Sequence, residues 1–219
     1  MVRWLLTEHL RRRLRRLFSC VYIRGSQHLR PWQEGSSTMP LLLYCSHNGW
    51  SDIALAAVLA RRHFKLQSRF LISPQQARHL PLLRFLGALT LPWEDPAALQ
   101  ELLPSVLPRL MPTPSVALWI FATGDFLSIG ETDSLWSCAD IVRLAQRPLA
   151  LAPAVWSYQL LQPEPTSYLW LGQPETCPSG GIPSALVQRC SQRLTELYEQ
   201  QQQLLASGTF QSAYHCYSL

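Results

Sequence analysis

Short runs of wholly apolar residues, separated by stretches with helical spacing, restrict the fold of this chain more than any other feature of its sequence. The three clearest runs span residues 41–45, 116–121 and 149–155. An apolar run of four to eight residues between turn residues is typical of a strand that is buried on both faces. Such strands need helices on both sides of their sheet. The sequence therefore predicts a single α/β domain with a mixed, mostly buried sheet flanked by helices.

Weaker patterns predict the remaining elements. Further strands are expected at residues 20–24, 69–72, 88–91 and 168–171, and helices at 53–60, 80–86, 96–110, 141–145 and 185–205. Pro104 and Pro108 fall inside one of these helices. A proline in a helix interior removes a backbone donor and crowds the preceding turn. We therefore expect the helix at 96–110 to be kinked or split.

The positive charge of the chain is concentrated at its start. Residues 1–30 hold eight arginines and one acidic residue, Glu8, whereas the whole chain of 219 residues has a net charge of +5. Hydrophobic residues make up 47% of the chain and charged residues 15%, against about 25% charged in an average soluble domain. The sequence thus describes a basic arm, residues 1–19, on a core-rich and nearly neutral domain, residues 20–219.

The basic arm has the pattern of an amphipathic helix over residues 2–18. Leu6, Leu10, Leu14 and Leu17 recur at steps of three and four, and most of the arginines fall elsewhere on the helix. Such a helix can lie on a membrane surface, with leucines toward the acyl chains and guanidinium groups on phosphates. It can also pack on its own domain with a solvated basic face. No aromatic-interleaved basic patch follows, so nucleic acid is not an expected partner.

Other features of the sequence predict the location and the cysteine chemistry. No stretch approaches the ~20 apolar residues of a membrane span, and the start lacks the basic-then-apolar order of a secretory signal. The protein is expected to be cytoplasmic, peripheral on the cytoplasmic face of a membrane. The six cysteines have no Cys-x-x-Cys spacing and are expected to be reduced thiols. The histidines form no metal-ligand pattern, and no metal is expected.

A histidine and an aspartate follow the apolar run at 41–45, with four residues between them. On one continuous helix His47 and Asp52 would lie about 140° apart. They can meet if His47 lies on a turn and Asp52 in the first turn of the next helix; Asn48-Gly49 is a turn dipeptide that permits this. Asp52 could then accept a hydrogen bond from one nitrogen of the His47 imidazole and so orient the ring. The other imidazole nitrogen would take a proton from a hydroxyl. Taken alone, the spacing also fits a capping aspartate beside a surface histidine.

The order of several short blocks resembles the glycerolipid acyltransferase family over about residues 20–172. The blocks that carry the resemblance are Val21–Gly25, Leu41–Asp52, Arg69–Ile72, Pro81 with Gly87–Leu91, Phe121–Gly124 and Leu151–Ala154. The resemblance implies transfer of an acyl chain from coenzyme A or acyl carrier protein to a lipid hydroxyl. In that scheme His47 is the base and Asp52 its orienter. The thioester is a co-substrate, and no bound cofactor is expected.

The same resemblance suggests further site residues and an unusual acceptor. Asn48, Gly49, Trp93, Thr123 and Gly124 are expected in the substrate-binding or oxyanion region, Gly124 because a glycine turn lets backbone N–H groups approach a charge. The family's two phosphate-binding arginines correspond to Trp93 and Phe126, and Asp125 would repel a phosphate. We therefore expect a neutral acceptor such as a glycolipid or another lipid alcohol.

Three alternatives to this interpretation stay open at the level of sequence. The first is a conventional lysophosphatidate acyltransferase of phospholipid synthesis that uses other arginines, such as Arg61, Arg62 or Arg84. The second is a catalytically inactive relative that binds lipids. The third is a hydrolase with Cys45 as nucleophile, although its position within an apolar strand favours an inert buried thiol. Trp93, Trp119, Trp136 and Trp156 are either groove or core residues.

Overall fold

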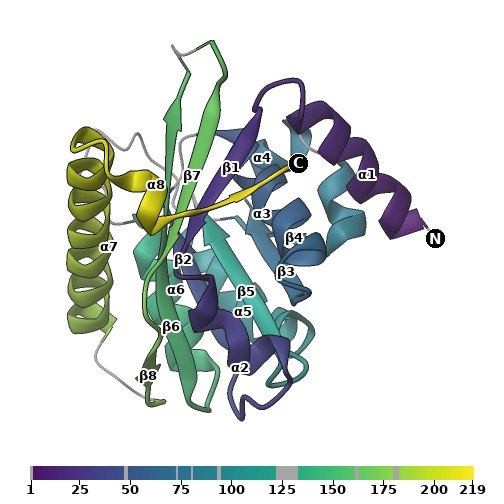
Figure 1. Cartoon of the computed structure of the whole chain (residues 1–219). Coiled ribbons are helices and arrows are strands. Elements are labelled where there is room, and N and C mark those ends of the chain that lie inside the picture. The colour runs from purple at the N-terminus through teal and green to yellow at the C-terminus, as the bar shows by residue number, and fades with distance from the viewer. Residues whose placement is uncertain are drawn as a thin grey trace.

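A single mixed sheet with helices on both faces forms the body of the protein, which confirms the predicted fold class (Figure 1). The computed structural model describes residues 2–46, 49–72, 74–79, 81–92, 95–121, 133–160, 163–179 and 183–219. All statements about structure below refer to these residues.

The strands follow one another across the sheet in the order β4-β3-β5-β2-β6-β7-β1-β9, with β8 paired to β6. Their bounds are β1 (Cys20–Arg24), β2 (Leu41–Cys45), β3 (Gln67–Ile72), β4 (Ala88–Thr90), β5 (Val116–Phe121), β6 (Leu149–Gln159), β7 (Thr166–Leu171), β8 (Glu175–Cys177) and β9 (His215–Tyr217). The pairs β4–β3, β3–β5, β5–β2, β2–β6 and β1–β7 are parallel. The pairs β6–β7, β6–β8 and β1–β9 are antiparallel.

The helices lie on the two faces of this sheet. Their bounds are α1 (Val2–Leu14), η1 (Ser26–Leu29, a 3₁₀ helix), α2 (Arg30–Gln33), α3 (Trp50–Arg62), α4 (Pro74–His79), η2 (Pro81–Leu86, also 3₁₀), α5 (Pro96–Leu110), α6 (Asp133–Leu144), α7 (Pro183–Ala206) and α8 (Phe210–Ala213). Helix α5 continues through Pro104 and Pro108, so of the predicted kink or split the split is wrong. Its buried leucines pack into a core, and this packing keeps the helix in one piece despite the lost backbone bonds.

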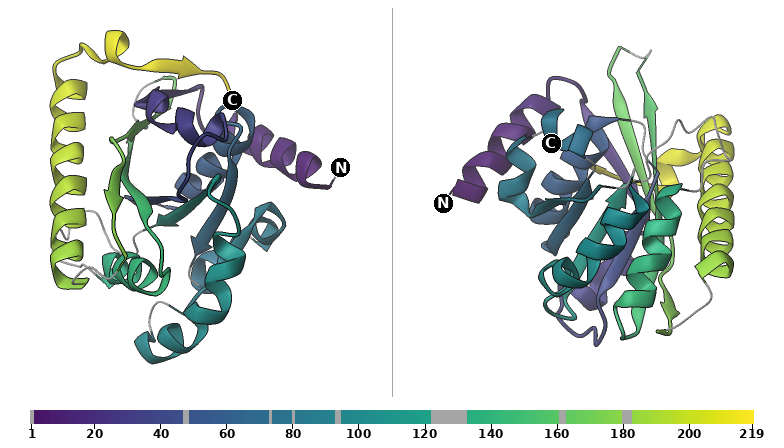
Figure 2. Two further views of the ribbon diagram at one scale, coloured as in Figure 1. Left: turned by 90° about the horizontal axis from the view of Figure 1, so that it is seen from below. Right: turned by 180° about the vertical axis from the view of Figure 1, so that it is seen from behind.

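Two hydrophobic cores lie on opposite faces of the sheet, and strand β2 contributes to both. Leu41, Leu43 and Cys45 belong to the core with α1 and α3, whereas Leu42 and Tyr44 belong to the core with α5, α6 and α7. Figures 1 and 2 show these two helical layers, with α3 and α7 on opposite sides of the strands. Because side chains alternate between the faces of a strand, burial on both sides requires the unbroken apolar run seen in the sequence.

Helix α1 packs Leu10 and Leu14 inside the domain. Leu10 and Leu14 are 2% and 0% exposed in the core that α1 shares with α3. Glu8 accepts hydrogen bonds from Arg11 of its own helix and, at 2.9 Å, from Arg62 of α3. The second of these bonds links α1 to α3. Of the two alternatives left open by the sequence, packing on the domain therefore holds for Leu10 and Leu14, whereas Leu17 is 42% exposed. Among the described residues, no helix combines the length and apolar character needed to cross a membrane.

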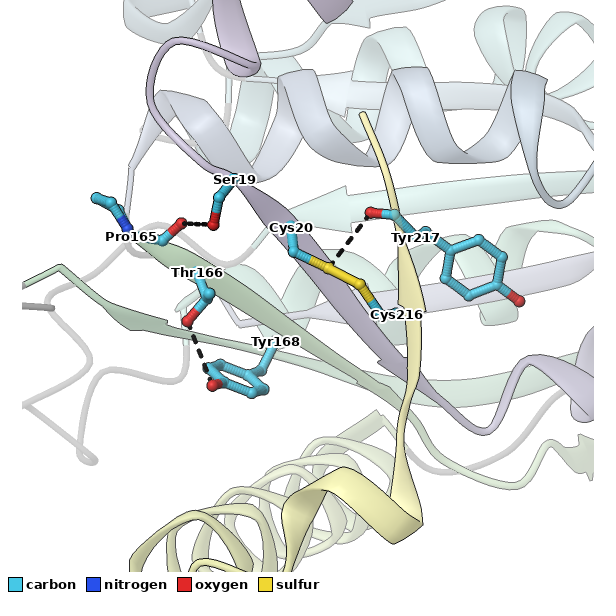
Figure 3. The surroundings of a disulfide bond; sticks show 7 residues. All are labelled: Ser19, Cys20, Pro165, Thr166, Tyr168, Cys216 and Tyr217. Atoms are coloured by element: carbon cyan, nitrogen blue, oxygen red, sulfur yellow. Dashed lines mark hydrogen bonds between the residues drawn. A yellow bond between two sulfur atoms is a disulfide. The ribbon is translucent and has the colours of Figure 1, made fainter. Parts of the chain in front are cut away.

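A disulfide joins Cys20 of β1 to Cys216 of β9 (Figure 3). The two strands pair antiparallel, which brings the Cα atoms of these cysteines to 6.4 Å, within the usual range for a disulfide. The expectation of reduced thiols is therefore wrong for this pair. It holds for Cys45, Cys138, Cys177 and Cys190, which are free and buried.

Candidate active site

Four parallel strands end at one edge of the sheet, and the predicted site residues follow these ends in the sequence. The last residue of β2, Cys45, lies beside Phe121, the last residue of β5. Strands β3 and β4 end beside each other at Ile72 and Thr90, and Leu71 lies beside Ile120 of β5. Ligands of open α/β sheets bind at the carboxyl ends of their strands. This carboxyl edge is therefore where we locate the candidate site.

The structure places two of the seven predicted site residues, Gly49 and Asp52. The other five lie outside the described residues: His47, Asn48, Trp93, Thr123 and Gly124. The described chain contains no group of three or more His, Cys, Asp or Glu side chains that could hold a metal ion.

Ser46 fixes the point at which the chain leaves β2. Its amide donates a hydrogen bond to the carbonyl of Ala154 at 2.9 Å. Its hydroxyl oxygen accepts a hydrogen bond from the amide of Trp156 at 2.8 Å, and the residue is fully buried. Two bonds to β6 thus hold the residue that immediately precedes His47.

Asp52 lies in the first turn of α3, as the sequence predicted. Gly49 is the N-cap residue; its amide donates to Oδ2 of Asp52 at 3.2 Å, and the Asp52 amide donates to the Gly49 carbonyl at 3.2 Å. A carboxylate at this position is also favoured by the helix dipole. Capping carboxylates usually remain in contact with water, whereas Asp52 is 0% exposed. Its burial indicates a role beyond closing the helix end.

Tyr158 of β6 is a site residue that sequence reasoning missed. Strand β6 extends beyond the end of β2, since Ala154 is the partner of Cys45 and Tyr158 lies four residues further along. The Tyr158 hydroxyl donates a hydrogen bond to Oδ1 of Asp52. Burial and the Asp52 carboxylate raise the pKa of Tyr158 well above its ordinary value, so the hydroxyl stays protonated as a donor. No local pattern in the sequence links two residues that are 106 positions apart.

Cys45 does not have the properties of a nucleophile. Its side chain is 1% exposed, and burial, followed by the nearby Asp52 carboxylate, raises the pKa of its thiol well above the ordinary value. Because the thiolate is the reactive form of cysteine, this environment suppresses its reactivity. Trp119 and Trp156 are likewise fully buried core residues, and neither lines a groove.

The alternative phosphate-binding arginines lie away from Asp52. Arg61 and Arg62 are in the last turn of α3, which places Arg61 about 14 Å from Asp52 along the helix axis. Arg61 instead lines a cavity of about 340 Å³ with Arg69, at the start of β3 and therefore at the opposite edge of the sheet. Arg84 lies in η2, just before β4 begins, and its guanidinium covers the ring of Phe85.

Neither a scan against family models nor a search of curated proteins finds a match to this chain. The resemblance to the glycerolipid acyltransferases therefore rests on the sequence blocks alone.

Proposed function

We propose that the protein is an O-acyltransferase that moves a fatty acyl group from a thioester to the hydroxyl of a lipid or glycolipid. The observation that carries the proposal is the buried Asp52 carboxylate, which lies at the carboxyl edge five residues after His47 and is held by Gly49 and Tyr158. A carboxylate held in this way suits the orientation of an imidazole base. The order of the sequence blocks along the strands of this edge is further support.

In the proposed reaction His47 carries one proton from the acceptor hydroxyl to the leaving thiolate. His47 takes the proton of the acceptor hydroxyl while the hydroxyl oxygen forms a bond to the thioester carbonyl carbon. The tetrahedral intermediate then collapses, the carbon–sulfur bond breaks, and the proton on His47 passes to the leaving thiolate. Asp52 fixes the imidazole tautomer and stabilises the imidazolium. Asn48, Gly49, Thr123 and Gly124 are the proposed surroundings of the developing oxyanion, and Trp93 of the acceptor.

The direct test is incubation of the purified protein with labelled acyl-coenzyme A, or acyl carrier protein, and a lipid extract. The expected result is a labelled lipid ester together with release of the free thiol. A protein that binds lipid vesicles and transfers no label from any thioester would instead be a lipid-binding relative of the enzymes.

A neutral acceptor is expected to react faster than its phosphorylated counterpart. The positions of the family's two phosphate-binding arginines hold Trp93 and Phe126 here, and Asp125 adds a negative charge. Loss of two charge-assisted, bidentate contacts disfavours a phosphate strongly. We expect kcat/KM for monoacylglycerol to exceed that for lysophosphatidate by at least about tenfold, which is about 1.4 kcal/mol. Equal or faster turnover of lysophosphatidate would support the alternative, a lysophosphatidate acyltransferase.

The proposed membrane contact differs from the one expected from the leucine pattern. The large apolar side chains exposed on or beside α1 form what we name the docking surface: Trp4, Leu5, Leu17, Trp50 and Phe85. Phe85 belongs to η2, against which α1 packs, and Trp50 is the first residue of α3, two positions before Asp52. Arg12, Arg13, Arg15 and Arg16 are exposed on α1 or directly after it. A surface that combines apolar side chains with arginines fits a bilayer that contains anionic lipids.

Two sets of substitutions test the docking surface on vesicles. Arg13, Arg15 and Arg16 are exposed and have no acidic partner among the described residues. Replacing all three with glutamine is expected to weaken binding to phosphatidylserine vesicles about a hundredfold, since each contributes about 1 kcal/mol. Trp4→Ser with Leu5→Ser should weaken it in both low and high salt. Leu102→Ser, an exposed leucine on α5, is the matched control and should bind as the wild type does. Unchanged binding by both sets would exclude this surface.

The cytoplasmic face expected from the sequence remains part of the proposal, and the disulfide between Cys20 and Cys216 counts against it. Disulfides persist in oxidising compartments and are rare in the reducing cytosol. In the cytosol this pair would be held as two thiols, and β9 would keep only its pairing with β1 and its packing contacts, such as that of Tyr217 with His63.

A further inference from the structure

The hydroxyl of Tyr158 lies between two residues of α3. Ser51 donates a hydrogen bond from Oγ to the Tyr158 oxygen at 3.3 Å. The Tyr158 oxygen carries a single hydrogen, which it donates to Oδ1 of Asp52. Because Ser51 supplies a donor from one side, the tyrosine proton is directed toward the carboxylate.

The ring and the backbone of Tyr158 also make contacts that hold the side chain in place. Phe18, a buried residue between α1 and β1, stacks on it with ring centroids 5.3 Å apart and an interplanar angle of 27°. The backbone of Tyr158 is paired with Ser167 of β7 in the antiparallel ladder. A side chain fixed by both strand pairing and ring stacking has little freedom to move its hydroxyl away from Asp52.

The two oxygens of Asp52 are therefore held by different elements. The Gly49 amide binds Oδ2 from the start of α3, and the Tyr158 hydroxyl binds Oδ1 from β6. A donor on each oxygen limits the rotation of the carboxylate about the Cβ–Cγ bond.

We propose that Tyr158 is a positioning residue, which holds the Asp52 carboxylate in the orientation needed to align the base His47. This inference rests on the acyl transfer proposed above and adds a residue of β6 to it. It also gives Phe18 a function: the segment that follows α1 supports the site through the tyrosine ring. Tyr158 acts on Asp52 and does not itself contact the reacting atoms.

Tyr158→Phe tests the inference, because it removes the hydroxyl and keeps the ring that stacks on Phe18. We expect kcat to fall about tenfold to a hundredfold, the usual range for residues that orient a functional group, with KM changed less than twofold. Tyr168→Phe is the matched control: Tyr168 lies on the adjacent strand β7, is buried, and donates to Gln159 at 2.8 Å instead of to Asp52. The control should keep the kcat of the wild type.

Four outcomes would overturn the inference in distinguishable ways. An unchanged kcat in Tyr158→Phe, or an equal loss in Tyr168→Phe, would leave the tyrosine only a structural role. Unfolding of Tyr158→Phe, Asp52→Ala and the double variant provides a readout without substrate: coupled residues should give a double variant about as stable as Asp52→Ala alone. Fully additive losses would show that the contact is absent. A wild type that transfers no acyl group would overturn the proposed function itself, and this role with it.

Discussion

Acyl transfer is expected to fall by at least about a thousandfold when His47 is replaced by alanine or Asp52 by asparagine. Without the imidazole, no group takes the acceptor proton. The Asp52 carboxylate accepts hydrogen bonds from two donors, the Gly49 amide and the Tyr158 hydroxyl. Asparagine at this position would turn its N–H₂ group, itself a donor, toward one of them. It also lacks the negative charge that stabilises an imidazolium. Both single variants should therefore keep only the part of the acceleration that substrate binding and the oxyanion surroundings supply.

The variant with both substitutions separates a catalytic pair from two independent residues. Groups that act as one unit give losses that do not add, so the double variant should be no slower than the slower single variant. Initial rates with labelled acyl-coenzyme A provide the measurement, and vesicle binding with thermal unfolding provides the control. Asp52→Asn is also expected to lose about 1–3 kcal/mol of stability, because it disturbs a buried hydrogen bond. Activity that survives in either folded variant would contradict the assignment of base and orienter.

The sequence predicted the bounds of three strands without error. The bounds expected for 20–24, 41–45 and 116–121 are those of β1, β2 and β5. Strands β2 and β5 are buried on both faces, whereas β1 alternates between buried and half-buried residues. In each case the physical signal is local, since a short run with almost no polar residue has nowhere to lie except inside a sheet. Strand β6 was expected to end at residue 155 and continues to Gln159. The missed residues include Ser157, Tyr158 and Gln159, whose polar groups break the apolar run, and they contain the tyrosine that binds Asp52.

The candidate site divides in the same way between local and distant contacts. Asp52 could be placed in a first helical turn because capping chemistry involves residues only three positions apart, such as Gly49. Its contact with Tyr158 spans 106 positions, and the disulfide spans 196. No periodicity or spacing encodes such contacts. The leucine pattern of α1 likewise shows that one face is apolar but does not specify whether lipid or the protein's own helix α3 covers it.

The disulfide leads to the largest expected change in stability from substitution of a single side chain. It ties β9, a three-residue strand at the edge of the sheet, to β1 near the start of the chain. A cross-link between residues 196 positions apart strongly lowers the conformational entropy of the unfolded chain. Cys216→Ser is therefore expected to lower the free energy of unfolding by about 2–5 kcal/mol under oxidising conditions. Cys20→Ser should produce the same loss, and the double variant should lose no more than either single variant.

Chemical denaturation with and without dithiothreitol distinguishes the cross-link from ordinary packing. The reductant should destabilise the wild type to the level of Cys216→Ser and leave that variant unchanged, because its four buried cysteines are free thiols. Thiol titration of the unfolded, unreduced wild type should count four thiols out of the six cysteines of the sequence. Six thiols, with equal stability of wild type and Cys216→Ser before reduction, would show that β9 is held without the disulfide. Such a result would also remove the main observation against a cytoplasmic location.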